Sequence, residues 1–87
     1  METIRQLLQD GKIDEAICLL DEMIANDSTS DEAFYLRGNA YRKRSDWQQA
    51  LNNYLVAMEL NPDSPAHQAY RMVIEILDFY HKDMFNQ

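Results

Sequence analysis

The chain is poor in residues that interrupt helices. Its 87 residues include only two glycines and two prolines. Both prolines, Pro62 and Pro65, fall at one junction, so long helices are allowed on either side of it. No segment alternates apolar and polar residues as a half-buried strand does. This composition predicts an all-α fold.

Cysteine and long apolar runs are also scarce. The single cysteine, Cys18, excludes an internal disulfide and fits a reducing compartment. No apolar run approaches the roughly 20 residues that a membrane-spanning helix needs. The chain opens directly into a helical pattern at Met1, without the basic segment and apolar core of a leader. We therefore expect a cytoplasmic protein that does not bind membranes.

Basic residues are outnumbered. Eight lysines and arginines stand against fifteen acidic residues, giving a net charge of -7. A nucleic-acid partner is not expected, because proteins that bind phosphate backbones normally carry a basic face. Four cations nevertheless cluster within Arg37–Arg44. They either complement the C-terminal end of a helix dipole or face a ligand, and the sequence leaves both readings open.

A period of thirty-four residues organises what is present. Ala16 and Leu20 fall under Ala50 and Tyr54 when the chain is shifted by this period, and Leu7 falls under Tyr41. A fixed period of this size is typical of a helical solenoid. The complete unit, 31–64, carries its marker residues at fixed spacing: Phe34, Gly38, Tyr41, Ala50, Tyr54, Ala57 and Pro62.

The spacing within 31–64 predicts two packed antiparallel helices. Gly38 would let small residues of the second helix approach closely, with Tyr54 filling the space beside them. Asp46 is a predicted N-cap with Gln49 three residues later, and Pro62 should end the second helix near Leu60.

These residues resemble the tetratricopeptide repeat, whose pattern fits 31–64 throughout except at Arg37. A leucine is usual there, and we expect Leu36 to take over part of its packing. Residues 1–30 resemble a clipped repeat with a short first helix. The resemblance implies an α-α superhelix of about five antiparallel helices in a single domain, 1–87.

Residues 65–87 are predicted to form one capping helix. Ser64 is its expected N-cap, and Pro65 suits the first turn. A solenoid needs such a helix to cover its last stacking face. The stripe expected to do so is Ala66, Ala69, Tyr70, Val73, Leu77, Tyr80 and Met84.

The resemblance also implies a function. Members of this family use the first helix of each pair to line a concave groove that holds a peptide or a helical segment of a partner protein. The groove residues that correspond here are Arg5, Tyr35, Asn39, Arg42 and Lys43. Ala69 and Val73 are apolar where the family's clamp for terminal carboxylates needs polar groups, so we do not expect a chaperone tail as ligand. The expected role is a non-enzymatic adaptor or scaffold for a protein or peptide partner.

The capping helix offers an alternative surface. Met72, Ile76 and Phe79 widen its apolar arc beyond what one packing face needs. This flank either packs against the second helix pair, which we favour, or mediates self-association or docking in a larger assembly. A monomer is accordingly expected over a homodimer.

Enzymatic motifs are missing from the chain. Cys18 has no histidine nearby in sequence, since His67 and His81 lie far along the capping helix. The sequence contains no glycine-rich phosphate loop, zinc-ligand spacing or cofactor fingerprint. We expect no catalytic residues, no metal site and no cofactor.

Overall fold

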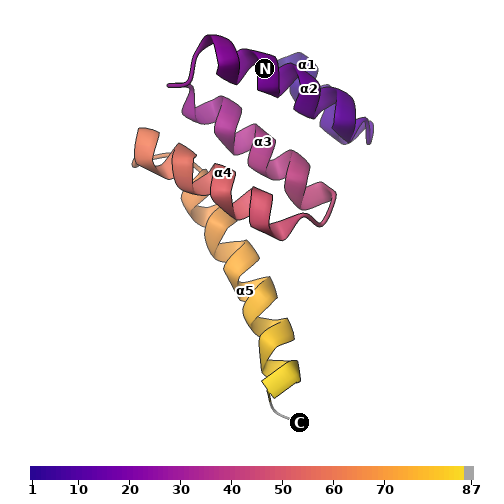
Figure 1. The fold of residues 1–87 in the computed structure, drawn as a ribbon, viewed down its shortest axis with the longest axis vertical. Coiled ribbons are helices and arrows are strands. Elements are labelled where there is room, and N and C mark those ends of the chain that lie inside the picture. The colour runs from indigo at the N-terminus through magenta and orange to yellow at the C-terminus, as the bar shows by residue number, and fades with distance from the viewer. Residues whose placement is uncertain (86–87) are drawn as a thin grey trace.

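A computed structural model describes residues 1–85, with side chains up to Tyr80. Within that range the chain forms five helices and no strand: α1 (Glu2–Gln9), α2 (Ile13–Asn26), α3 (Asp31–Lys43), α4 (Trp47–Leu60) and α5 (Ala66–Phe85). Successive helices stack as an antiparallel array that measures 47 × 29 × 17 Å (Figure 1). The predicted all-α superhelix is confirmed, and α1 is short, as the clipped first repeat indicated. None of these helices is long and apolar enough to cross a membrane.

The thirty-four-residue period reappears in the turns. Gly11, after α1, has φ 78°, and Ser45, after α3, has φ 62°. Both residues occupy the left-handed region, which glycine adopts readily and serine does not. The two hairpins therefore close through equivalent turns, although only one of them uses glycine.

The helix starts follow the predicted capping chemistry. Asp46 accepts a hydrogen bond from the backbone N–H of Gln49 at 3.3 Å, and Ser64 accepts one from Ala66 at 3.1 Å. Ser30 caps α3 in the same way, accepting from Ala33 at 3.2 Å. These contacts satisfy backbone donors that have no partner inside the helix. Local sequence thus sets where α3, α4 and α5 begin.

Gly38 marks the closest approach of α3 and α4. A Cβ added there would lie 2.5 Å from Cε1 of Tyr54, so the tyrosine ring occupies the space that a side chain would fill. The expectation of a close approach is correct, but the ring itself, not a small residue, lies against the glycine. The phenol stays fully buried in this position.

The apolar interior consists of two clusters that share α3. The first gathers buried residues of α1, α2 and α3: Ile4, Leu8, Ala16, Ile17, Leu20, Ala33, Leu36 and Ala40. The second gathers residues of α3, α4 and α5: Phe34, Ala50, Tyr54, Ala57, Ala66, Ala69 and Val73. Ile24, Tyr35 and Tyr41 pack against both clusters. Leu36 is buried as expected, and α3 ties the two repeats together.

The capping helix covers α4 with only part of its expected stripe. Ala66, Ala69 and Val73 are buried, and Leu77 is partly buried. Tyr80, also assigned to the stripe, is 58% exposed, so that expectation is wrong. The reason is geometric, because the C-terminal half of α5 runs past the other helices (Figure 1). The side chain of Met84 lies outside the described ones.

Candidate protein-binding surface

Alternate helices line two clefts on one surface of the array. The clefts are formed by α1, by α3 and by the start of α5 with its preceding turn, whereas α2 and α4 contribute no lining residue. Tyr35 of α3 lines both clefts. We call the combined region the inner surface. It corresponds to the helices from which a groove was expected.

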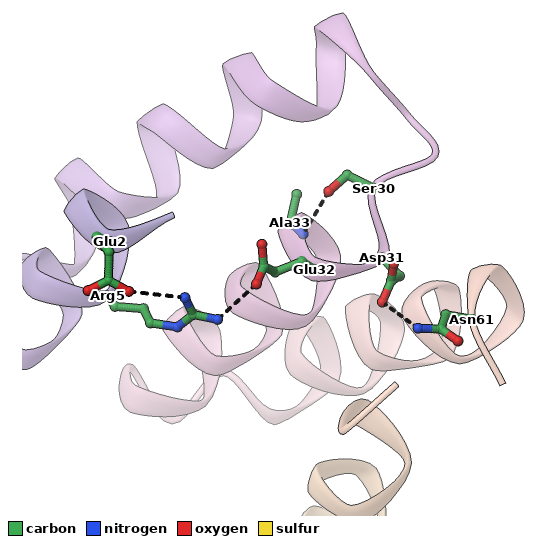
Figure 2. Close-up of polar contacts among 7 residues, drawn as sticks. All are labelled: Glu2, Arg5, Ser30, Asp31, Glu32, Ala33 and Asn61. Carbon is green, nitrogen blue, oxygen red and sulfur yellow. Dashed lines mark hydrogen bonds and ion pairs between the residues drawn. The ribbon is translucent and has the colours of Figure 1, made fainter. Parts of the chain in front are cut away.

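The first cleft is small, and its charged side chains already have partners within the chain. It encloses about 110 Å³ among Arg5, Asp31, Glu32, Tyr35, Ser64 and Pro65. Arg5 reaches from α1 to Glu32 of α3 at 2.9 Å and also lies 3.5 Å from Glu2 (Figure 2). The hydrogen bond to Glu32 raises the pKa of Arg5 above its ordinary value. Asp31 accepts a hydrogen bond from Asn61 at 3.1 Å (Figure 2). This end of the inner surface mainly joins helices to one another.

The second cleft holds a cation without an ion-pair partner. It encloses about 290 Å³ among Tyr35, Arg42, Pro65, Gln68, Ala69 and Met72. No carboxylate belongs to this lining, and within the described residues Arg42 makes no ion pair. We call it the Arg42 cleft. Its contents suit a ligand that offers negative charge beside an apolar group.

The other arginines of the basic cluster are held by the fold. Arg37 donates to Asn53 of α4 at 2.7 Å and to Asp21 of α2 at 2.8 Å. Arg44 lies 3.2 Å from Asp14 of α2. Lys43 is exposed and lines neither cleft. The structure therefore divides the cluster, and Arg42 is the member that lines a cleft.

The side chain of Asn39 already makes a hydrogen bond to another residue of the fold. Its side-chain oxygen accepts a hydrogen bond from the hydroxyl of Tyr54, whose ring lies across from Tyr35 at a centroid distance of 6.1 Å. Burial raises the pKa of Tyr54 to about 12, although the nearby Arg42 cation acts in the opposite direction. Tyr54 thus stays protonated at neutral pH and orients Asn39. Of the predicted groove residues, Tyr35 and Arg42 share a cleft, and Arg5 shares the other one with Tyr35.

The far half of α5 presents an exposed apolar surface. Met72, Glu75, Ile76, Phe79 and Tyr80 border a shallow depression of about 460 Å³. Phe79 is 63% exposed and Met72 is 47% exposed. The expectation that this flank packs against the second helix pair is therefore wrong. We call these five residues the α5 strip.

Sequence reasoning missed several of these lining residues. Gln68 and Pro65 were not assigned to the groove, because their place opposite α3 depends on how α5 packs against α4. Tyr80 shares a helix face with Met72, Ile76 and Phe79, but that spacing does not show whether the face is covered or exposed. Across the described part of the chain, no group of His, Cys, Asp or Glu is arranged to hold a metal ion.

Comparisons with known proteins agree with this architecture. A family model described as "Tetratricopeptide repeat" matches residues 31–64. The solution NMR structure of the Bacteroides fragilis protein BF1650 is 56% identical, with a TM-score of 0.87, over 99% of this chain and 88% of that one. No curated protein matches the chain. Tetratricopeptide repeats generally mediate protein–protein interactions. The repeat match and the fold it shares with this near relative establish that the chain belongs to the tetratricopeptide repeat family.

Proposed function

We propose that the protein is an adaptor whose inner surface binds a short peptide or helical segment of a partner protein. The observation that carries this proposal is the Arg42 cleft. It combines an aromatic ring, an amide and a thioether around a cation that lacks an ion pair among the described residues. Such a mixture of one charge with adaptable apolar groups suits a protein ligand.

Charge supports the choice of ligand. Arg5, Arg37 and Arg44 are neutralised by carboxylates of the same chain. Arg42 keeps its charge available in a cleft without acidic lining, although the chain as a whole is acidic. A partner segment with an aspartate, a glutamate or a free C-terminal carboxylate would satisfy this cation.

A displayed library of random 16-residue peptides tests the proposal. Peptides enriched on the folded protein are synthesised, and their affinities are measured by titration calorimetry. Arg42→Glu should weaken binding at least tenfold, about 1.4 kcal/mol, because it places a like charge against the ligand. Arg71→Glu makes the same charge change on an exposed residue outside both clefts and should alter affinity less than threefold.

Folding must be shown to survive both substitutions, by circular dichroism and thermal unfolding. Arg42→Ala provides a second variant that removes the cation without reversing charge. If no selected peptide is sensitive to either Arg42 substitution in a folded protein, the inner surface is not the binding site and the proposal fails.

A further inference from the structure

The Arg42 cleft and the α5 strip form one continuous surface. Met72 lines both, with Tyr35 and Arg42 on one side and Ile76 and Phe79 on the other. From Met72 to Phe79 the strip extends along α5 by about 10 Å, at about 1.5 Å per residue. A ligand seated at Arg42 would therefore meet exposed apolar side chains in one direction.

The strip belongs to a helix, and this restricts the form of the ligand. Backbone N–H and C=O groups in the middle of α5 bond to one another, so the strip offers side chains and no open strand edge. An extended peptide lying there would find no backbone partner on α5 and would depend on water for its own backbone hydrogen bonds. A helix satisfies its backbone internally and can lay one apolar face on the strip.

Two charged side chains border this surface. Arg42 lies at one end, while Glu75 borders the strip beside Ile76. Neither makes an ion pair within the described residues. A helix with an acidic residue near Arg42 and a basic residue beside its apolar face would complement both.

From these contacts we infer that the ligand of the inner surface is an amphipathic helix of a partner protein, with an acidic residue about one turn from two bulky apolar residues. The apolar residues lie on Met72, Ile76 and Phe79, and the acidic residue pairs with Arg42. This inference rests on the proposed function and specifies its ligand.

The peptides enriched from the 16-residue library supply the test. They should carry an acidic residue and, before or after it in sequence, apolar residues at helical spacing of three or four. Phe79→Ser should weaken their binding at least tenfold. Leu55→Ser is the matched control, because Leu55 is 44% exposed on α4 but lines neither cleft nor the strip, and its affinity change should stay below threefold. A proline placed in the middle of the peptide should also reduce binding at least tenfold, since it breaks a helix.

The outcomes separate this inference from the function on which it rests. Peptides that depend on Arg42 but tolerate both Phe79→Ser and the internal proline would overturn the helical ligand and leave the adaptor in place. Peptides insensitive to Arg42 and Phe79 alike would overturn both. Sedimentation velocity of the protein alone tests whether a second copy of the chain occupies the strip instead. Self-association abolished by Phe79→Ser would assign the strip to a dimer and overturn the inference.

Discussion

Tyr54 has the largest fully buried side chain among the described residues. It is fully buried, its ring fills the space over Gly38, and its hydroxyl donates to Asn39. One side chain therefore joins α3 to α4 and also orients a residue on the face of α3 that carries Tyr35. Packing and the candidate site are coupled through this phenol.

The pKa of Tyr54 predicts a loss of stability in alkali. Because burial raises it from 10.0 to about 12, the folded state holds its proton more tightly than the unfolded state does. The stabilisation is complete below pH 10 and is lost as the pH rises from 10 to 12, by about 2 kcal/mol. Urea unfolding followed by circular dichroism across this range measures the loss. Tyr54→Phe should unfold with a flatter pH profile, and parallel profiles would contradict the assignment.

Arg37 illustrates which contacts of a single residue cannot be predicted from the sequence. Its departure from the repeat pattern was visible, and the burial of its neighbour Leu36 was expected and confirmed. Its partners were not foreseeable, since Asp21 and Asn53 lie sixteen residues to either side. Only the rotation of three packed helices brings them to one guanidinium. The same limit applies to Asn39, whose engagement with Tyr54 depends on the fit of α3 against α4.

Ser45, in the turn between α3 and α4, has a backbone conformation that is unfavourable for a residue other than glycine. A non-glycine residue in the left-handed region costs roughly 1–2 kcal/mol, whereas glycine loses about 0.5–1 kcal/mol of chain entropy. Ser45→Gly should therefore stabilise the protein by about 0.5–1 kcal/mol, measured as a higher urea midpoint. Gly11→Ala in the equivalent turn should destabilise it by about 1 kcal/mol.

A serine outside the left-handed region serves as the control for this comparison. Ser28 lies in the exposed turn between α2 and α3, and its φ is not positive. Ser28→Gly should leave stability unchanged or lower it by up to about 1 kcal/mol. Equal stabilisation by glycine at positions 28 and 45 would show that the backbone conformation of Ser45 is not the cause.

Helix boundaries could be predicted because their causes are local. The cap at Asp46, the stop before Pro62 and the start at Ser64 each depend on residues within a few positions. The exposure of Phe79 and Tyr80 could not be predicted in the same way. It depends on the length of α5 relative to α4 and on the angle at which they cross, which no local pattern specifies. The groove residues were accordingly easier to propose than the α5 strip.

The two apolar clusters depend on each other, so the molecule should fold as one unit. They share α3, which supplies Leu36 to the first cluster and Phe34 to the second. Ion pairs also join the two repeats, since Arg37 on α3 and Arg44 just after it pair with carboxylates on α2. Solenoid repeats gain stability from such neighbour contacts, and a short array has few of them to lose.

Unfolding should consequently be a single transition. Ile17→Val trims the first cluster and should cost about 0.5–1.5 kcal/mol, while Val73→Ala trims the second and should cost about 2 kcal/mol. Each variant should lower the midpoint seen by far-ultraviolet circular dichroism and by Trp47 fluorescence equally, because neither cluster stays folded without α3. Leu55→Ala, at an exposed site, should stay within about 0.5 kcal/mol of the parent. If Ile17→Val instead unfolds in two steps, and the Trp47 fluorescence changes only in the second, the second cluster folds on its own.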